Sequence, residues 1–396
     1  MDNVRERVMH RTSSSSAPGD AAALGAYAYW PDNLEWSTQM LRLIGYAYVG
    51  GADFSEVHAV ARSLPVGDRE AWREGFAALA RRVDEQAERA HAGGHRVSAR
   101  EAWLRACVYY RISGQLHAID GLRDAPGVAD SRRCFRSAAP LAPAPIEPVE
   151  IPYETTTLPG YLVAAADGDG PRPAVIVIGG IDAFSEEMYL KIGRALSERG
   201  FAALLFDGPG QGEARRRGIY ARHDYEVPVA AAIDWLQARA EIDGERIALV
   251  GSSLGGYYAT RAAAYEPRLR ACVIWGASEG IDLAKLQPGG PLENRLRQVQ
   301  ALFGTDDPDE LRAKAGGFDL DGVAARIACP TLIVHGESDV LVPLAAAQRT
   351  YDEIVHDDKQ LITYPPGEPG CTHCQLDALS AAHHDICNWL EDHAAA

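Results

Sequence analysis

Two hydrophobic patterns divide the chain. From residue 20 to residue 140, apolar residues recur at helical spacing with charges between them, as in DREAWREGFAALARRVDEQAERA and SAREAWLRACVYYRIS. In the second run, Ser98 followed by Glu101 is typical of a capping box at a helix start. We therefore predict a helical N-terminal domain over 20–140. Residues 1–19 lack this pattern and are expected to form a disordered leader.

A different pattern follows the Pro/Ala-rich linker SAAPLAPAPIEP. Residues 141–396 alternate short apolar runs with helical segments expected around 185–198, 225–240, 256–265 and 344–355. The run VEIPYETTTLPGYLVAA predicts a hairpin. Buried strands are predicted by PAVIVIGG, FAALLFDGPG, RIALVGSS, RACVIWGAS, PTLIVHGESD and KQLITYPPG. This alternation is typical of an α/β domain with a mainly parallel sheet covered by helices on both faces. In such sheets, function gathers at the carboxyl ends of the strands.

One of these strand ends carries a G-x-S-x-G motif. The run RIALVGSSLGG lies between an expected strand and an expected helix, with Ser253 at the centre of the motif. Flanking glycines allow a turn so tight that the serine takes a strained backbone conformation and exposes its hydroxyl. We predict that Ser253 is a nucleophile and that Ser252 is a bystander. The alternative is an ordinary strand-to-helix turn.

A nucleophilic serine needs a base and a group that orients the base. The loop after the predicted strand PTLIVHG supplies Asp339, with Glu337 as the alternative acid. His373 lies in the loop after the last predicted strand, whereas His335 ends a strand and is expected to be structural. The chain order serine, acid, histidine is that of nucleophile-elbow hydrolases. We therefore predict the triad Ser253, Asp339 and His373.

Backbone N–H groups should stabilise the oxyanion that such a serine creates. The amide of Leu254, directly after the nucleophile, is one candidate donor. The second donor is expected from the glycine pair in PAVIVIGGIDAF, at Ile181 or Gly180. A phosphate loop is disfavoured because the chain contains no G-x-x-x-x-G-K-[ST] motif. We interpret the other glycine-rich run, FDGPGQGE, as a structural turn in which Asp207 braces loops.

The composition of the chain argues against several kinds of binding partner. A net charge of −16 argues against nucleic-acid binding, which needs a basic face. No apolar run is long enough to cross a membrane, and the N-terminus has no secretion signal. The seven scattered cysteines suit a reducing compartment, so we expect a cytoplasmic protein. Cys371 and Cys374 form a C-x-x-C without a second pair, and we predict neither a metal nor a cofactor.

These motifs together resemble the α/β-hydrolase superfamily. The resemblance rests on AVIVIGG, FDGPGQGE, GSSLGGYYATRAAAYEPRLRACVIWG, VHGESDVLVP and the THC around His373, and it covers the chain from about residue 20 onward. More narrowly, the chain resembles the subfamily of 2,6-dihydroxypseudooxynicotine hydrolase, fungal polyketide-shortening hydrolases and fermentation-respiration switch proteins. That subfamily implies an α/β-hydrolase fold with an N-terminal helical cap domain, the same triad, and a homodimer.

The resemblance also implies a reaction. Better-known members hydrolyse a carbon–carbon bond beside a ketone, so our first hypothesis is a serine hydrolase acting on an aromatic or polyketide-like small molecule. The alternative is an esterase, thioesterase or acyltransferase with the same triad. A third hypothesis is a binding or regulatory protein on the hydrolase fold. Both direct attack by Ser253 and activation of water by His373 fit the sequence.

Four further residues are candidates for the substrate pocket. Tyr109, Tyr110 and His117 lie in the expected cap domain. The two tyrosines are expected first of all to be core residues, and an inner face of this domain could also line a cleft. Glu279 follows the predicted strand RACVIWG, at a place where some members of the resembled subfamily carry an extra acidic residue. Asp282 is the alternative for that acidic position.

Overall fold

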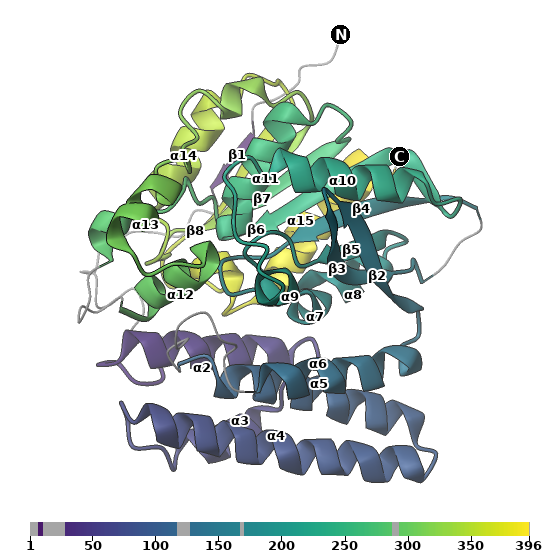
Figure 1. The fold of residues 1–396 in the computed structure, drawn as a ribbon, viewed down its shortest axis with the longest axis vertical. Helices are drawn as coiled ribbons and strands as arrows, with labels where there is room; N and C mark the ends of the chain where they lie inside the picture. The colour runs from purple at the N-terminus through teal and green to yellow at the C-terminus, as the bar shows by residue number, and fades with distance from the viewer. Residues whose placement is uncertain (1–6, 11–27, 117–126, 167–169, 287–292, 396) are drawn as a thin grey trace. The chain divides into compact units, whose positions relative to one another are not determined.

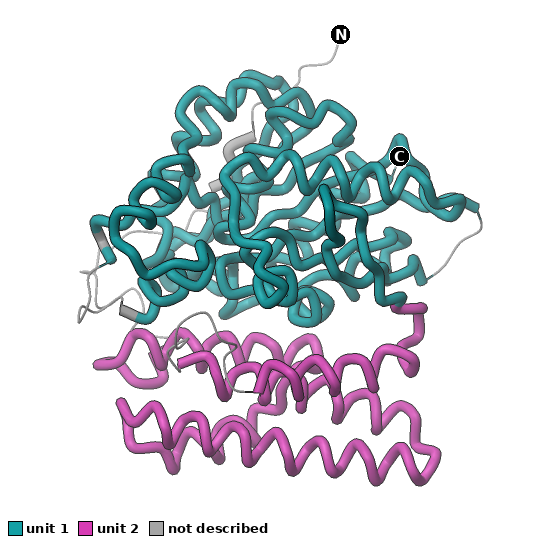
Figure 2. Tube along the Cα trace, viewed as in Figure 1, with its two compact units in different colours: residues 1–17, 147–396 teal, residues 18–146 magenta. Residues whose placement is uncertain are grey.

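The computed structural model describes residues 7–10, 28–116, 127–166, 170–286 and 293–395. Its chain divides into two compact units, one made of residues 18–146 and the other of residues 1–17 and 147–396 (Figure 2). The division falls inside the Pro/Ala-rich run. The first residues of that run continue a helix to Ala138, and its last residues already belong to a strand that starts at Ile146.

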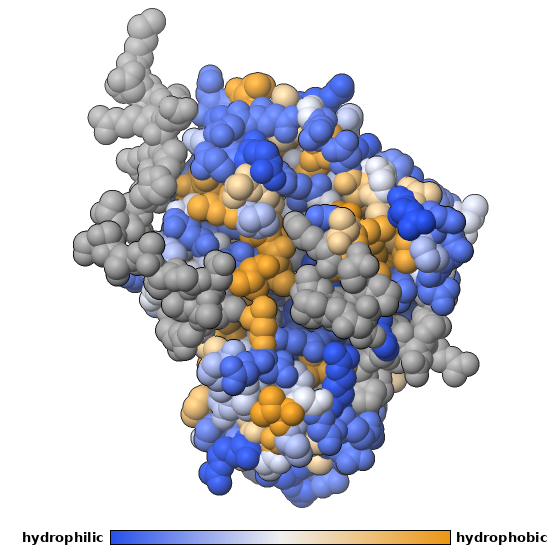
Figure 3. Space-filling view, turned by 90° about the vertical axis from the view of Figure 1, so that its left-hand side faces the viewer, coloured by the Kyte–Doolittle hydropathy of each residue, from blue (hydrophilic) through white to orange (hydrophobic). Residues whose placement is uncertain are grey.

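The unit of residues 18–146 is helical in its described part. Its core is aromatic: Trp36 and Trp72 are almost fully buried, and their ring centroids lie 4.9 Å apart. Polar residues dominate its visible surface, with single hydrophobic residues among them (Figure 3). The helices are α2 (Leu34–Ala47), α3 (Phe54–Ala61), α4 (Arg69–Ala92), α5 (Arg96–Ser113), α6 (Val128–Ala138) and the 3-10 turn η1 (Ala139–Leu141).

Helix α5 does not begin with the predicted capping box. It begins at Arg96, two residues before Ser98, and its N-cap residue His95 makes no side-chain capping hydrogen bond. The chain reverses direction at Gly94, which has a φ of 78°, so the next helix starts at once. Ser98 is therefore inside the first turn of the helix, where a serine side chain cannot act as the cap.

The other unit is built on one sheet. Its strands are β1 (Arg7–His10), β2 (Ile146–Tyr153), β3 (Thr156–Val163), β4 (Arg172–Ile178), β5 (Ala202–Phe206), β6 (Ile242–Ser252), β7 (Ala271–Trp275), β8 (Thr331–Gly336) and β9 (Lys359–Tyr364). Among the described residues the strand order is β1-β9-β8-β7-β6-β4-β5-β3-β2. All pairs from β5 to β1 are parallel, whereas β3 runs antiparallel to β5.

Helices cover this sheet on both faces (Figure 1). They are α7 (Ser185–Met188), the π-helical turn η2 (Tyr189–Gly193), α8 (Arg194–Ser197), α9 (Gly212–Arg216), α10 (Glu226–Gln237), α11 (Leu254–Tyr265), η3 (Leu283–Lys285), α12 (Glu293–Phe303), α13 (Pro308–Ala315), η4 (Ala324–Arg326), α14 (Leu344–Glu353), η5 (His373–Gln375) and α15 (Leu379–Ala394). Apolar residues of α10, α11, α12 and α14 form one core cluster with alternate strand residues, such as Ile176 and Leu249. Helix α15 packs beside α8 and also contacts β6, β7 and β8. This is the predicted α/β class with a mainly parallel sheet.

Part of the expected leader is a strand. Residues 1–19 were expected to be disordered, but Arg7–His10 pair in parallel with the outer edge of β9. Without this partner β9 would end the sheet, with unpaired backbone N–H and C=O groups along its length. A short segment with the sequence RVMH satisfies those groups, although four residues are too few for a hydrophobic pattern to predict the strand.

None of the helices in the described ranges is both long enough and apolar enough to cross a membrane.

Candidate active site

The G-x-S-x-G run forms a tight turn between β6 and α11. Ser253 has φ 62° and ψ −120°, a conformation that residues other than glycine rarely adopt. A side chain at Gly251 would place its Cβ 1.9 Å from the carbonyl oxygen of Gly255, and a Cβ at Gly255 would lie 2.5 Å from the carbonyl oxygen of Ile178. The two glycines are therefore required for the close approach of helix and strand. Between them the turn presents the Ser253 hydroxyl at the carboxyl end of the sheet.

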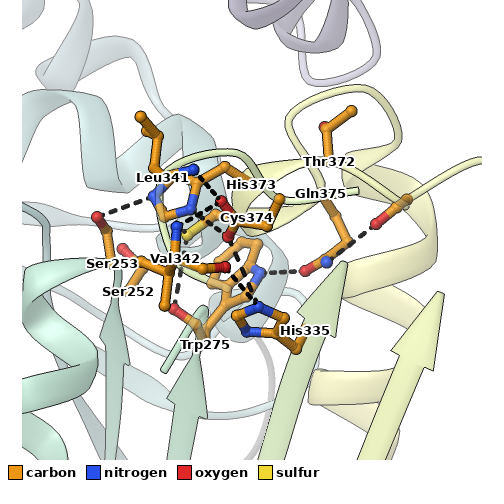
Figure 4. A network of polar contacts seen from close by, with 12 residues as sticks. Ser252, Ser253, Trp275, His335, Leu341, Val342, Thr372, His373, Cys374 and Gln375 are labelled. Atoms are coloured by element: carbon orange, nitrogen blue, oxygen red, sulfur yellow. Dashed lines mark hydrogen bonds and ion pairs between the residues drawn. The ribbon is translucent and has the colours of Figure 1, made fainter. Parts of the chain in front are cut away.

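The loop after β9 brings His373 to this hydroxyl (Figure 4). The loop after β8 brings Asp339 to the other ring nitrogen of His373. The Nε2 atom of His373 lies 2.9 Å from Ser253 Oγ, and its Nδ1 lies 2.6 Å from Asp339 Oδ2. Ser253 follows β6, Asp339 follows β8, and His373 follows β9. Because these strands are parallel and lie within the four consecutive strands β9-β8-β7-β6, their carboxyl ends meet at one edge of the sheet. The structure therefore brings together the three residues that the sequence predicted as a triad.

The Asp339 carboxylate is held from several sides. Its Oδ1 accepts hydrogen bonds from the backbone N–H groups of Leu341 (2.8 Å) and Val342 (2.9 Å). The fully buried His335 donates from Nε2 to the carbonyl oxygen of Val342 (3.0 Å) and so secures the same loop. The alternative acid, Glu337, points elsewhere and accepts a hydrogen bond from Thr363 Oγ1. Of the two candidate acids, Asp339 is therefore the one within hydrogen-bond reach of His373.

Burial and neighbouring charges shift the pKa values of these groups in opposite directions. Burial alone would lower the pKa of His373, but the adjacent Asp339 carboxylate reverses this and holds the pKa above its usual value. Burial likewise opposes ionisation of Asp339, yet the contacts with His373 keep the pKa of the carboxyl below its usual range. Burial lowers the pKa of His335, which favours the neutral ring. The arrangement stabilises an imidazolium at His373, the form that a general base takes after accepting a proton.

The loop that carries the predicted oxyanion donors, residues 179–181 (the oxyanion loop), lies against the nucleophile. A Cβ added to Gly180 would lie 3.0 Å from the Cβ of Ser253 and 3.3 Å from its Oγ, so glycine permits this contact. Asp207 braces the neighbouring loops as expected, because its two carboxylate oxygens accept hydrogen bonds from the N–H groups of Ser185 and Glu213, both at 2.8 Å.

A cavity of about 690 Å³ opens beside these residues. Ile181 and Leu254 line it together with the loop that carries Asp339. Its other walls are mixed, with apolar side chains and several charged ones. Examples are Ile281, Leu286, Val299, Phe318, Asp282 and Arg295. Cavities of 300–1,000 Å³ with mostly apolar walls and a few polar groups are typical of small-molecule sites.

Glu279 lines this cavity but is paired with a cation. The Nε atom of Arg349 donates to Glu279 Oε1 at 2.7 Å, and a second guanidinium nitrogen contacts Oε2. Asp282, also in the wall, caps η3 by accepting a hydrogen bond from the Ala284 N–H at 3.0 Å. Glu279 is thus a wall residue held in a two-point ion pair.

Two other predicted pocket residues make hydrogen bonds within their own unit. Tyr109 is fully buried; its hydroxyl donates to Glu56 Oε2 (2.8 Å) and accepts from the Asp53 N–H (2.7 Å). Tyr110 is buried on the same helix and donates to Asp84 Oδ2. Both tyrosines tie the helices of their own unit together, as expected of core residues, and their place in a substrate pocket stays a prediction. His117 lies outside the described residues.

The sequence did not predict roles for two residues beneath the predicted triad, Cys374 and Lys191. The Sγ of Cys374 lies 3.6 Å from His373 Nε2, and Lys191 donates from Nζ to Ser252 Oγ at 3.0 Å while lying over the Trp275 ring. Burial raises the pKa of the Cys374 thiol, but the charges of His373 and Lys191 outweigh it and lower that pKa overall. The C-x-x-C spacing drew attention to Cys374, whereas no local signal singled out Lys191.

Family models match most of this chain. Residues 71–283 match the model of FrsA-like esterases, and residues 194–395 match the prolyl oligopeptidase family. Among individual proteins, 2,6-dihydropseudooxynicotine hydrolase from Paenarthrobacter nicotinovorans is 32% identical over 81% of this chain and 84% of its own length. The hydrolase acrC from Aspergillus aculeatus is 37% identical over 92% of this chain and 98% of its own length.

Solved structures agree with these matches. The crystal structure of 2,6-dihydroxy-pseudo-oxynicotine hydrolase is 30% identical and covers 88% of this chain, with 95% of its own chain covered and a TM-score of 0.77. At this identity and coverage the similarity extends through both units. The chain therefore belongs to the FrsA-like family of α/β-hydrolases and is an enzyme of the hydrolase class.

Proposed function

We propose that the protein is a serine hydrolase that cleaves a carbon–carbon bond beside a ketone in an aromatic or polyketide-like small molecule. The observation that carries the proposal is the continuous hydrogen-bonded chain from Ser253 through His373 to Asp339, beside a 690 Å³ cavity whose wall includes Asp339. Such a chain lets His373 take the hydroxyl proton while Ser253 attacks a carbonyl carbon.

The remaining steps follow from the same groups. Attack forms a bond from Ser253 Oγ to the carbonyl carbon and places negative charge on the carbonyl oxygen, which the N–H groups of Leu254 and of Ile181 or Gly180 would stabilise. As the intermediate collapses, the carbon–carbon bond breaks, its electron pair leaves as an enolate, and His373 returns the proton to it. Water then releases the acyl group from Ser253, with His373 again acting as base.

The relatives support the choice of substrate class. One is named for its action on 2,6-dihydropseudooxynicotine, and the cavity of this chain combines apolar wall residues with a few polar and charged ones, which suits a compact organic substrate. The same triad also suits ester and thioester hydrolysis or acyl transfer, and the family model is one of esterases. Comparing 1,3-diketones with esters and thioesters of matched size separates these reactions through their values of kcat/KM.

The first experiment tests the nucleophile itself. Intact-protein mass spectrometry after incubation with a fluorophosphonate should give a single adduct, which Ser253→Ala abolishes. The matched control is Ser252→Ala, because the Ser252 hydroxyl is buried and held by Lys191, and this variant should keep the adduct. A folded wild type without an adduct would contradict direct attack by Ser253 and favour activation of water by His373.

Two further proposals concern the compartment and the oligomeric state. The first rests on composition and the second on the resembled subfamily. The enzyme is proposed to be cytoplasmic and to form a homodimer. Light scattering of the purified protein tests the second prediction, since a homodimer has twice the mass of one chain.

A further inference from the structure

A buried glutamine lies behind the proposed oxyanion loop. Gln211 belongs to the FDGPGQGE run after β5, precedes α9, and is only 2% exposed. Its Nε2 donates two hydrogen bonds, one to the carbonyl oxygen of Gly179 (2.7 Å) and one to that of Gly180 (3.0 Å). Carbonyl oxygens can only accept, so the amide nitrogen must be the atom that faces them.

The other end of this side chain is fixed as well. The hydroxyl of Tyr225 donates to Gln211 Oε1 at 2.9 Å, and Tyr225 is fully buried. Its ring stacks on Tyr258, with the two centroids 3.6 Å apart. Both hydrogens of the Gln211 amide group and its oxygen are thus engaged, and the side chain has one orientation. A side chain locked in this way can transmit its orientation to the backbone that it binds.

Because peptide groups are planar, the two hydrogen bonds from Gln211 also fix the direction of two backbone N–H groups. Each carbonyl shares a rigid plane with the N–H of the next residue, so the carbonyls of Gly179 and Gly180 fix the N–H groups of Gly180 and Ile181. These peptides are trans, so each N–H points away from the carbonyl of its own plane. Gln211 draws both carbonyls to one side, and the two N–H groups are directed to the opposite side.

That opposite side is the catalytic side. Gly180 packs against Ser253, and Ile181 lines the cavity together with Leu254. Among the described residues none accepts a hydrogen bond from the Ile181 N–H. Leu254, the first residue of α11, likewise has no partner for its N–H inside the helix. Both groups are therefore available to an oxygen bound at Ser253.

We propose that Gln211 is a positioning residue of the oxyanion hole: it does not touch the substrate but aims the backbone donors of the Gly179–Ile181 loop at the developing oxyanion. The inference rests on the proposed role of Ser253. It also gives the FDGPGQGE run a function beyond that of a structural turn. Deleting an entire oxyanion donor costs about 10²–10³-fold in kcat, and misaiming two donors should cost at least about tenfold.

The test compares three variants. Gln211→Met keeps the length of the side chain and removes both donors. Tyr225→Phe keeps the donors and removes only the hydroxyl that orients Gln211, so its effect should be intermediate. Tyr258→Phe is the matched control, because the buried Tyr258 hydroxyl in the same stacked pair has no hydrogen-bond partner among the described residues. It should keep the wild-type rate.

Two measurements decide the outcome. In Gln211→Met the second-order rate of fluorophosphonate labelling and the kcat for an activated ester should fall at least about tenfold. KM and the midpoint of the pH–rate profile should stay unchanged, since neither the cavity wall nor the His373–Asp339 pair is altered. A crystal structure of Gln211→Met should show that the peptides of Gly179 and Gly180 have rotated.

Other results would overturn the inference. Unrotated peptides with an unchanged labelling rate would show that the Gly179–Ile181 loop keeps its conformation without Gln211. A shifted pH midpoint or a raised KM would indicate a general loss of structure rather than misaimed donors. If the wild type itself is not labelled, the role of Ser253 fails, and the crystal structure alone then decides whether Gln211 orients the loop.

Discussion

Asp339 shows how one carboxylate divides its two oxygens between structure and chemistry. One oxygen accepts two backbone N–H groups of its own loop, and the other faces His373 Nδ1. The first set of contacts fixes the position of the second, so the charge beside the imidazole is held without help from solvent. His335 adds a further restraint through the Val342 carbonyl.

This arrangement predicts the pH dependence of hydrolysis. Asp339 raises the pKa of His373 by stabilising the imidazolium, although burial acts in the opposite direction. The base must be neutral to accept a proton, so activity should increase with pH through this raised pKa. In Asp339→Asn the stabilising charge is gone, and the midpoint should move to lower pH. The kcat should also fall by about 10⁴-fold, the cost of the same change in a serine protease. Both effects are read from pH–rate profiles with an activated ester.

The control for this prediction is the neighbouring acid. Glu337→Gln removes a carboxylate of the same loop that contacts Thr363 rather than His373, so the profile should keep its midpoint. A shift of the midpoint in Glu337→Gln but not in Asp339→Asn would contradict the assignment. The sequence alone favoured Asp339 through its place in the loop, and the hydrogen bonds of Glu337 give the physical reason.

At the scale of secondary-structure elements, the turn between β6 and α11 depends on close backbone contacts. A Cβ at Gly255 would lie 2.5 Å from the carbonyl oxygen of Ile178 and 2.7 Å from that of Gly179, and both oxygens belong to backbone that cannot move independently. In contrast, a Cβ at Gly256 would lie 3.2 Å from its nearest neighbour, the carbonyl oxygen of Gly276.

We therefore expect Gly255→Ala to destabilise the protein by about 1–3 kcal/mol, the usual cost of overpacking a dense core. It should also reduce fluorophosphonate labelling, since the helix must shift away from the oxyanion loop. Gly256→Ala should cost less. Urea unfolding of the two variants measures the difference, and equal destabilisation would show that backbone contact at Gly255 is not the limiting feature.

The segment predicted as a helix over 185–198 shows what periodicity leaves undetermined. The structure contains α7, the π-helical turn η2 and α8 in its place. A π turn adds one residue per turn, which changes the direction of the side chains after it, and π turns are frequent at functional sites. Here η2 carries Lys191 to the Ser252 hydroxyl beneath the nucleophile turn. The helical pattern predicted the segment but not the turn within it.

At the scale of the whole molecule, we propose that the cavity beside the predicted triad determines which substrates fit. Its walls come from segments between residues 181 and 349, far apart in sequence. Leu286 is a partly exposed wall residue that packs against the main core, so a larger side chain there can be accommodated without unfolding.

We expect Leu286→Trp to lower kcat/KM for bulky aromatic diketones at least about tenfold, because a few kcal/mol of lost contact is worth that much. A small activated ester should be hydrolysed at nearly the wild-type rate, since Ser253, His373 and Asp339 are untouched. Val355→Trp, at a position that is 72% exposed and outside the cavity wall, serves as the control. Equal losses on both substrates would contradict a role for this cavity in selecting substrates by size.

The sequence by itself determined strands β2 to β9, the nucleophile turn and the chain order of the predicted triad residues. Each of these depends on local rules: apolar runs bury strands, glycines permit a strained turn, and parallel strand ends share one edge of a sheet. Local patterns also placed Tyr109 and Tyr110 on a helix and in the core of their own unit.

Only the tertiary structure decided the contacts between distant segments. The pairing of Arg7–His10 with β9, the grip of Gln211 on the oxyanion loop and the place of Lys191 beneath the nucleophile each join residues that no spacing relates. Such contacts depend on which buried polar groups find partners when all the elements pack together. That balance is a property of the whole fold rather than of any one stretch of the chain.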